Sequence, residues 1–277
     1  MSDPKPPLPL LPESKGAAPG RGRLNGKRIL VVGGGQRVFD AATDPVGNGR
    51  AMCLTFAREG AKVAVADAVL EAAEATLEKL KGDGGEGIAI KADVCSEDDV
   101  VRMFEEVVAG LGGLDGVVFN VGTFGGVGLR ISVEEWNTIL DINLRGAVLV
   151  GREAIERLEP YGSLVLTSSV AGFKPGSQMI AYDASKAGLG GVMRYLARVG
   201  AAQDIRVNMV VPGLVDTPNG RTAGAGRASR GSGANLPFRR QATGWEIANA
   251  ALFFTSNDSV YVTAQHLAVD SGLLGMT

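Results

Sequence analysis

The sequence predicts an α/β fold, with a parallel sheet of about seven strands and helices on both faces. Short apolar runs recur along the chain, and their continuous apolar character is typical of strands covered on both faces. Helix-length amphipathic stretches alternate with them, which favours a doubly wound sheet. The expected strands are 28–32, 62–66, 87–91, 116–119, 163–167, 205–210 and 266–270. The expected helices lie near 48–59, 70–81, 97–110, 132–158, 182–201 and 244–256.

Composition narrows the class of protein. The chain has 277 residues, of which 45% are hydrophobic and 21% charged, a balance typical of a globular domain. A formal net charge of -2 gives no electrostatic case for a nucleic-acid partner. No apolar run is long enough to cross a membrane. The two cysteines are far apart and the only histidine, His266, is expected to be a packed structural residue, so we expect no metal site and a cytoplasmic protein.

Two segments depart from the alternating pattern. Residues 1–25 are rich in proline, glycine and small polar residues, so we expect a flexible arm before a single domain, 26–277. Residues 217–244 are poor in large apolar side chains and carry five arginines without an acid. This second segment is either a contact for an anionic substrate or a solvated loop, and we favour the solvated loop.

The stretch "GGGQRVFDAATDPVGNGRA" (33–51) follows the first expected strand and leads into a helix. That is the context of a dinucleotide-binding loop, in which backbone N–H groups at a helix start receive a pyrophosphate. Asp67 ends the second expected strand, where a carboxylate accepts hydrogen bonds from ribose hydroxyls and repels a 2′-phosphate. This favours NAD over NADP. Two alternatives stay open: Asp67 as a helix N-cap, and Arg37 or Arg50 as a partner for a 2′-phosphate.

A second cluster lies in "LVLTSSVAGFKPGSQMIAYDASKAGL" (164–189). Tyr182 and Lys186 are four residues apart and therefore share one face of a helix. Ser169 follows the strand 163–167, and the carboxyl ends of parallel strands form the ligand crevice. Each residue alone is also compatible with a structural role. Together, their spacing predicts a catalytic group.

With these motifs the sequence resembles the short-chain dehydrogenase/reductase family over roughly residues 26 to 274. The resemblance implies a Rossmann-type domain. It also implies four catalytic residues: Asn143, Ser169, Tyr182 and Lys186. The cofactor contacts would be Gly33, Gly47, Asn48, Gly49, Asp67, Asp93, Val94, Asn120, Gly122, Tyr182, Lys186, Pro212, Gly213, Val215 and Thr217, with Gly34 as the alternative first glycine. The substrate contacts would be Ser169, Tyr182 and Gln178.

The resemblance also implies a reaction. Lys186 would favour the tyrosinate form of Tyr182, which would exchange a proton with a secondary alcohol or ketone while hydride passes to or from NAD. Ser169 would steady the substrate oxygen, and Asn143 would support a water leading from the lysine to solvent. An NADP-dependent reductase and a non-catalytic NAD-binding regulator are the alternatives. A homo-oligomer, tetramer or dimer, built on the helices 132–158 and 182–201 is expected by resemblance only.

Two motifs depart from the family pattern. "FNVG" replaces the usual Asn-Asn-Ala-Gly turn, so Phe119 and Val121 differ. The family's first two glycines are usually about four positions apart, whereas Gly33 and Gly47 are fourteen apart, so about ten residues are extra. We interpret 36–46 as an inserted bulge outside the phosphate cradle that leans over the cofactor or toward the substrate mouth. The alternative is an inert surface loop.

Overall fold

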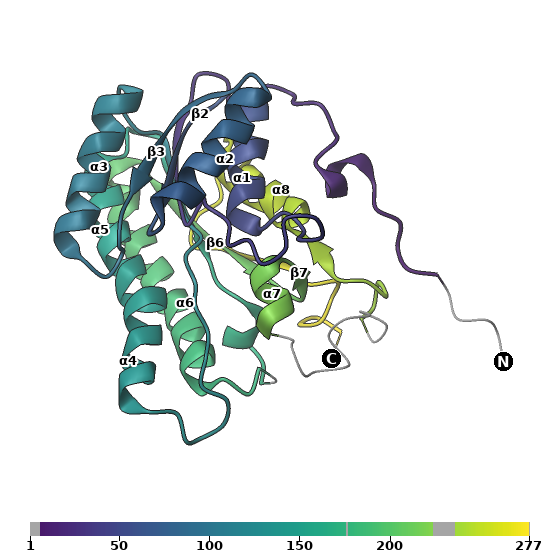
Figure 1. The fold of residues 1–277 in the computed structure, drawn as a ribbon. Coiled ribbons are helices and arrows are strands. Elements are labelled where there is room, and N and C mark those ends of the chain that lie inside the picture. The colour runs from purple at the N-terminus through teal and green to yellow at the C-terminus, as the bar shows by residue number, and fades with distance from the viewer. Residues whose placement is uncertain (1–5, 176, 224–235, 277) are drawn as a thin grey trace.

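A parallel sheet forms the centre of the computed structural model, which describes residues 6–175, 177–223 and 236–276. Within these residues seven strands pair in the order β3-β2-β1-β4-β5-β6-β9, all parallel (Figure 1). The strands are β1 Arg28–Val32, β2 Lys62–Asp67, β3 Glu86–Lys91, β4 Gly116–Phe119, β5 Ser163–Thr167, β6 Arg206–Pro212 and β9 His266–Val269. The predicted fold class is confirmed, because each expected strand is present.

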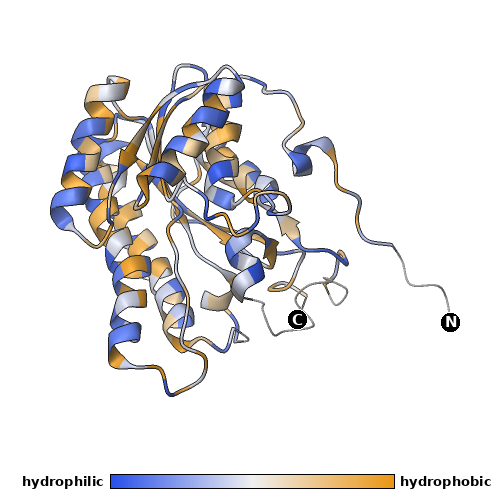
Figure 2. Ribbon diagram, viewed as in Figure 1, coloured by the Kyte–Doolittle hydropathy of each residue, from blue (hydrophilic) through white to orange (hydrophobic). Residues whose placement is uncertain are grey.

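Helices cover both faces of the sheet. On one face α1 packs against α2 and α8, and on the other α5 packs against α3 and α6 (Figure 1). Their bounds are α1 Asn48–Arg58, α2 Leu70–Gly82, α3 Glu97–Leu111, α5 Gly146–Arg157, α6 Ile180–Gly200 and α8 Gly244–Thr255. β1 serves both layers, since Leu30 and Val32 join one hydrophobic cluster while Ile29 and Val31 join the other. Figure 2 shows the resulting apolar sheet between helices that are polar on their outer sides.

The expected helix 132–158 is present as one continuous helical run, 133–157, but it contains a π turn that the sequence did not predict. It consists of α4 (Val133–Leu140), a π-helical turn (Asp141–Arg145) and α5. The amphipathic pattern runs through the whole stretch and shows no break at this turn. Single π turns inside helices are frequent at functional sites. Here the turn carries the fully buried Asn143.

The segment 217–244 is not wholly irregular. It contains the short helix α7 (Pro218–Ala223), and its last residues form β8 (Ala242–Thr243), which pairs with β7 (Val215–Asp216). Two of its five arginines, Arg227 and Arg230, lie outside the described residues.

The three other arginines of this segment contact the protein itself. Arg221 pairs with Asp216 and Arg240 with Glu246, while Arg239 donates to the Pro6 carbonyl. These contacts give no support to the reading in which the arginines bind an anionic substrate.

The sole histidine was expected to be packed, and this is wrong. His266 lies on the edge strand β9 and is exposed. Its ring is 4.9 Å from that of Phe173, centroid to centroid.

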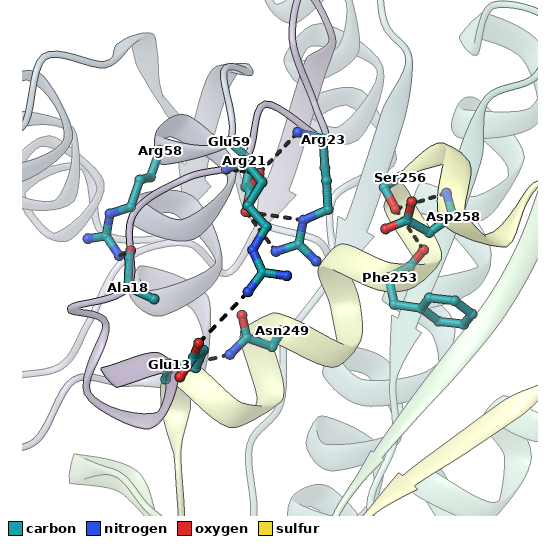
Figure 3. Close-up of polar contacts among 10 residues, drawn as sticks. All are labelled: Glu13, Ala18, Arg21, Arg23, Arg58, Glu59, Asn249, Phe253, Ser256 and Asp258. Carbon is teal, nitrogen blue, oxygen red and sulfur yellow. Dashed lines mark hydrogen bonds and ion pairs between the residues drawn. The ribbon is translucent and has the colours of Figure 1, made fainter. Parts of the chain in front are cut away.

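The N-terminal segment lies along α1 and α8. The Ser14 hydroxyl donates to Glu246 Oε1 at 2.9 Å, and the side chain of Leu24 is fully buried. Figure 3 shows Asn249 of α8 reaching the Glu13 carbonyl and Arg58 of α1 reaching the Ala18 carbonyl. The division into an arm and a domain at residue 25 stays a prediction. The contacts with the domain begin earlier, at Pro6.

Glu59 anchors this segment at the end of α1 (Figure 3). Its carboxylate accepts the Arg23 guanidinium at 2.6 Å and the backbone N–H groups of Arg21 and Arg23 at 2.9 and 3.0 Å. Burial raises the pKa of Glu59, but these hydrogen bonds outweigh it and hold the pKa below the ordinary glutamate value. The carboxylate is therefore ionised in the folded protein and stabilises it.

We predict that Glu59→Gln lowers the free energy of unfolding by about 1–3 kcal/mol at pH 7. The NH₂ group of the glutamine amide would face the N–H donors of Arg21 and Arg23, which the carboxylate accepts in wild type. A lowered folded pKa gives stability that is present above the unfolded pKa of about 4.3 and lost as pH falls through the folded pKa. The difference from wild type should therefore shrink below about pH 4. Urea unfolding across pH measures it. Glu86→Gln breaks the exposed Lys62–Glu86 pair and should change little.

Candidate active site

The predicted site residues follow successive strands along the carboxyl edge of the sheet. Asp93 comes after β3 and Asp67 ends β2, while Gly33 follows β1. The next strands continue this row, and the residues at their ends are Asn120 and Gly122 after β4, Ser169 after β5, and Pro212 and Gly213 at β6. Because the strand order is β3-β2-β1-β4-β5-β6, the row runs from Asp93 at one end to Gly213 at the other. Ligands of open α/β sheets bind in this crevice.

The two ends of the stretched glycine loop meet in space. A Cβ added to Gly49 would lie 1.9 Å from the Gly33 carbonyl oxygen, so only glycine fits at residue 49. The same carbonyl accepts a hydrogen bond from Asn120 Nδ2 at 3.1 Å. Gly33 has a φ of 79°, a left-handed conformation that favours glycine. Gly33, rather than Gly34, is therefore the glycine that faces Gly49 across the insertion.

The start of α1 is open to an anion. Gly47 is its N-cap residue and contributes no side-chain cap, and the first N–H groups of a helix have no intrahelical acceptor. Asn48 Oδ1 is buried and has no hydrogen-bond partner among the described residues. The glycine cradle fits a bound phosphate group beside α1, because N–H donors and the helix dipole favour negative charge there.

Asp67 lies beside the glycine loop. Its carboxylate accepts the Gly35 N–H at 3.0 Å and the Val69 N–H at 3.1 Å. Val69, not Asp67, is the N-cap residue of α2, so the alternative of a helix cap is wrong. Arg50 is buried and donates from Nε to Thr76 Oγ1 at 3.0 Å, which turns it away from the role of a 2′-phosphate partner. Arg37 is exposed.

Asp93 and Val94 form the far end of the row. Asp93 Oδ1 accepts the Cys95 N–H at 2.9 Å, which shapes the turn after β3. Val94 is buried against Gly146, where a Cβ would approach the valine to 2.8 Å. This end is separated from Ser169 and Gly213 by several strands, as the two ends of an extended ligand require.

Lys186 is the buried cation of the site. Its Nζ donates to the carbonyls of Thr167 at 3.1 Å and Val121 at 3.3 Å, which joins α6 to the ends of β4 and β5. A Cβ on Gly122 would lie 3.1 Å from this Nζ. Burial lowers the pKa of Lys186 to about 8, so most of the amine is still protonated at neutral pH. The Nζ lies 5.9 Å from the centre of the Tyr182 ring.

Tyr182 and Ser169 flank this lysine. The Tyr182 ring is half-buried and meets Phe124 edge-on, with centroids 6.4 Å apart. Ser169 begins a short helical turn, Val170–Gly172, and its Oγ accepts the Ala171 N–H at 3.2 Å. That turn packs on α6 at Lys186, because a Cβ on Gly172 would lie 2.7 Å from the Lys186 carbonyl carbon. The serine is thereby held beside the helix that carries the tyrosine and lysine.

Asn143 positions the loop after β4. Its Nδ2 donates to the Thr123 carbonyl at 2.8 Å and to Ser185 Oγ at 3.0 Å, and its Oδ1 accepts the Thr123 N–H at 2.7 Å. The side chain thus ties the π turn to α6 and to the chain beside Gly122. Its part in a water path stays a prediction.

The remaining predicted residues lie at the Gly213 end of the row or, in the case of Gln178, just before α6. Gly213 donates to the Val269 carbonyl at 3.0 Å, and Val215 is on β7. Thr217 Oγ1 accepts the Gly220 N–H at 2.9 Å at the start of α7. Gln178 has a φ of 62°, and its carbonyl accepts the Gly128 N–H.

Sequence reasoning missed several residues that hold the site together. Ser168 Oγ donates to the Lys186 carbonyl at 2.8 Å, and Ser185 holds Asn143. Thr167 Oγ1 is buried without a hydrogen-bond partner among the described residues. The polar run "TSS" (167–169), at the end of an apolar strand, was the available signal for Thr167 and Ser168. Ser185 sits inside a helix, and its sequence context gives none.

Comparison with solved structures and with a family model decides the family. A short-chain dehydrogenase/reductase from Burkholderia xenovorans superposes with a TM-score of 0.83 at 34% identity, covering 91% of this chain and 98% of its own. A family model described as enoyl-(acyl carrier protein) reductase matches residues 42–274. The chain belongs to the short-chain dehydrogenase/reductase family.

Curated members of the family agree over nearly the whole chain. Glucose 1-dehydrogenase of Gluconobacter oxydans is 36% identical, with 92% of this chain and 95% of the relative covered. The 3-oxoacyl-(acyl-carrier-protein) reductase of Thermotoga maritima is 32% identical, with 91% and 99% covered. This short-chain dehydrogenase/reductase is an NAD(P)-dependent oxidoreductase that acts on CH–OH groups, converting between alcohol and ketone.

Residues 6–175, 177–223 and 236–276 contain neither a membrane-spanning helix nor a cluster of metal ligands. No helix there combines the length and apolar character that a membrane crossing needs. No three His, Cys, Asp or Glu side chains gather there as metal ligands.

We predict that burial of Lys186 makes stability depend on pH. Its folded pKa of about 8 lies below the unfolded value of about 10.4, so the cost of burying the charge is full below pH 8 and is relieved above it. The unfolding free energy of wild type should therefore rise relative to Lys186→Met, by up to about 3 kcal/mol, between pH 7.5 and 10.5. Urea unfolding measures this difference, and Lys62→Met removes an exposed lysine as the control. A constant difference would contradict the prediction.

Proposed function

We propose that this enzyme transfers a hydride between NAD and a secondary alcohol or ketone, with Tyr182 as the general acid and base. The observation that carries the proposal is the buried, largely protonated Lys186, whose Nζ lies 5.9 Å from the Tyr182 ring centre. A cation at this distance favours the tyrosinate, which an isolated tyrosine with a pKa of about 10 does not reach at neutral pH.

The chain's own residues divide the work of proton transfer. Tyr182 takes the proton of the substrate hydroxyl during oxidation and returns it to the oxygen during reduction. Ser169, held beside α6 by its own turn, donates a hydrogen bond to the substrate oxygen and steadies its charge. Asn143 keeps the Gly122 loop against Lys186 and acts as a positioning residue. Gln178 is the proposed side chain at the substrate's far edge.

The residues present fit a dinucleotide. When bound, its nicotinamide ring accepts or supplies the hydride. Gly33, Gly47, Asn48 and Gly49 would hold the pyrophosphate, and Pro212, Gly213, Val215 and Thr217 would face the nicotinamide end, with Thr167 Oγ1 as an unused hydrogen-bonding group nearby. Asp67 would hold the adenosine ribose and Asp93 with Val94 the adenine. Asn120 and Gly122 lie between these ends.

We propose NAD rather than NADP as the preferred cofactor. The Asp67 carboxylate would accept ribose hydroxyls and repel a 2′-phosphate. Burial of Arg50 supports the same choice, because it removes one of the two arginines that could hold that phosphate. Arg37 is the remaining candidate.

We further propose a cytoplasmic homo-oligomer, a tetramer or dimer, that takes a small-molecule substrate and no nucleic acid. Exposed apolar side chains on α5 and α6 support the assembly: Val148, Tyr195 and Val199. Relatives of this chain differ in substrate: by their names, one is a dehydrogenase of glucose, and two others are reductases of a 3-oxoacyl group and of tetrahydroxynaphthalene. The proposal is therefore confined to the alcohol and ketone groups.

We predict that Tyr182→Phe lowers turnover by about 10²- to 10⁴-fold, the usual contribution of a general acid–base. The dissociation constant for NADH, measured by fluorescence, should change little, because the phenol oxygen is not the main cofactor contact. Tyr261→Phe, at a fully exposed tyrosine outside the site, is the matched control. Full activity in Tyr182→Phe would remove this residue from the mechanism. Binding of NAD by wild type without turnover across alcohols and ketones would favour the non-catalytic regulator.

We predict that Asp67→Asn raises the affinity for NADPH relative to NADH by about tenfold, because the amide keeps its shape and loses the charge that repels a 2′-phosphate. Competitive titration of both dinucleotides measures the ratio. Asp93→Asn, at the proposed adenine end, should affect both dinucleotides alike. A wild-type enzyme that prefers NADPH would overturn the proposed role of Asp67.

A further inference from the structure

The insertion 36–46 is a compact loop that closes on itself at the phosphate end of the site. Gln36 clips its two ends together: Nε2 donates to the Pro45 carbonyl at 3.2 Å, and Oε1 accepts the Gly47 N–H at 2.8 Å. Asp44 Oδ2 accepts the N–H groups of Phe39 and Asp40 at 2.6 and 3.0 Å. The clip ties the insertion to Gly47, the N-cap residue of α1.

The far side of the loop is bound to α7. Arg221 Nη1 donates to the Thr43 carbonyl at 2.9 Å, and the same guanidinium pairs with both oxygens of Asp216 at 2.7 and 3.0 Å. Asp216 lies on β7, between Val215 and Thr217. In Figure 1 the loop lies directly beside α7. One arginine therefore joins the glycine loop to the stretch proposed to receive the nicotinamide.

This link joins two segments that border the proposed cofactor cleft. They are the start of α1, where the pyrophosphate would sit, and the segment 213–217 at the other end of the same crevice. A dinucleotide that runs along the carboxyl edge of the sheet would contact both segments. The clip also occupies the Gly47 N–H with Gln36, so the anion is left to the later N–H groups of α1.

We propose that residues 36–46, fastened to α7 through Arg221, form a retaining strap for the bound dinucleotide. Cofactor release then requires the contact between Arg221 and the Thr43 carbonyl to break. Arg221 is a positioning residue in this scheme, because it acts through the loop and through Asp216 rather than on substrate. The inference rests on the proposed dinucleotide function and adds to it an element that sets the cofactor's residence time.

The test is the dissociation rate of NADH, measured by stopped-flow fluorescence after displacement with excess NAD and without substrate. Arg221→Met should raise this rate by about three- to tenfold, the effect of losing a hydrogen bond of ordinary strength. Arg221→Lys should bring the rate part of the way back toward the wild-type value. The lysine ammonium can donate a hydrogen bond, but it lacks the planar guanidinium that pairs with both oxygens of Asp216. Arg102→Met, which breaks similar exposed pairs with Asp99 and Glu106 on α3, is the matched control and should release NADH like wild type.

A second variant removes residues 36–45 and so returns the glycines to about four positions apart. Its NADH dissociation rate should match or exceed that of Arg221→Met. If cofactor release limits turnover, kcat of this variant should also rise. Unchanged dissociation rates in Arg221→Met, with its fold verified by circular dichroism, would overturn the strap and leave the proposed function intact. A wild-type protein that binds neither NADH nor NADPH would overturn both.

Discussion

The close approach of Gly49 to the Gly33 carbonyl is the constraint on which the rest of the site depends. It brings the first turn of α1 against the end of β1, and Asn120 holds the same carbonyl from the neighbouring strand. A single Cβ at residue 49 would separate these three elements. The long excursion between the glycines is tolerated because lengthening a loop costs little free energy once its ends are fixed. The insertion therefore adds residues beside the proposed cleft and leaves the contact between Gly33, Gly49 and Asn120 in place.

Lys186 is a second point at which elements of the site are held together. Its ammonium has two carbonyl partners from the ends of β4 and β5, so α6 is fixed to the sheet through a buried charge. Burial of that charge costs stability, which the two hydrogen bonds offset in part. The same burial places the charge in a medium where its effect on a neighbouring phenol is strong. Burial of the Lys186 charge therefore lowers the stability of the fold and, by the same cause, strengthens the effect of this charge on Tyr182.

Much of the fold could be predicted from the sequence, because the strands are continuous apolar runs and the helices have regular amphipathic patterns. Strands β1, β4 and β5 were predicted to the residue. The Tyr182–Lys186 spacing was equally informative, since helical geometry places both residues on one face.

The misses share a physical cause. The π turn at Asn143, the burial of Arg50 against Thr76 and the Gln36 clip all depend on partners distant in sequence or on hydrogen bonds that leave the hydropathy pattern unchanged. The exposed position of His266 follows from β9 being an edge strand, which a local pattern does not reveal.

The contacts of the N-terminal segment have a consequence for how the chain is made. Ser14 and Glu246 are separated by 232 positions, so the acceptor is synthesised long after the donor. Domains generally fold during synthesis from their N-terminal side, and contacts between distant residues form late. The contacts of Arg21 and Arg23 with Glu59 can form once α1 is present. The contacts around Ser14 must wait for α8, so this segment docks in two stages.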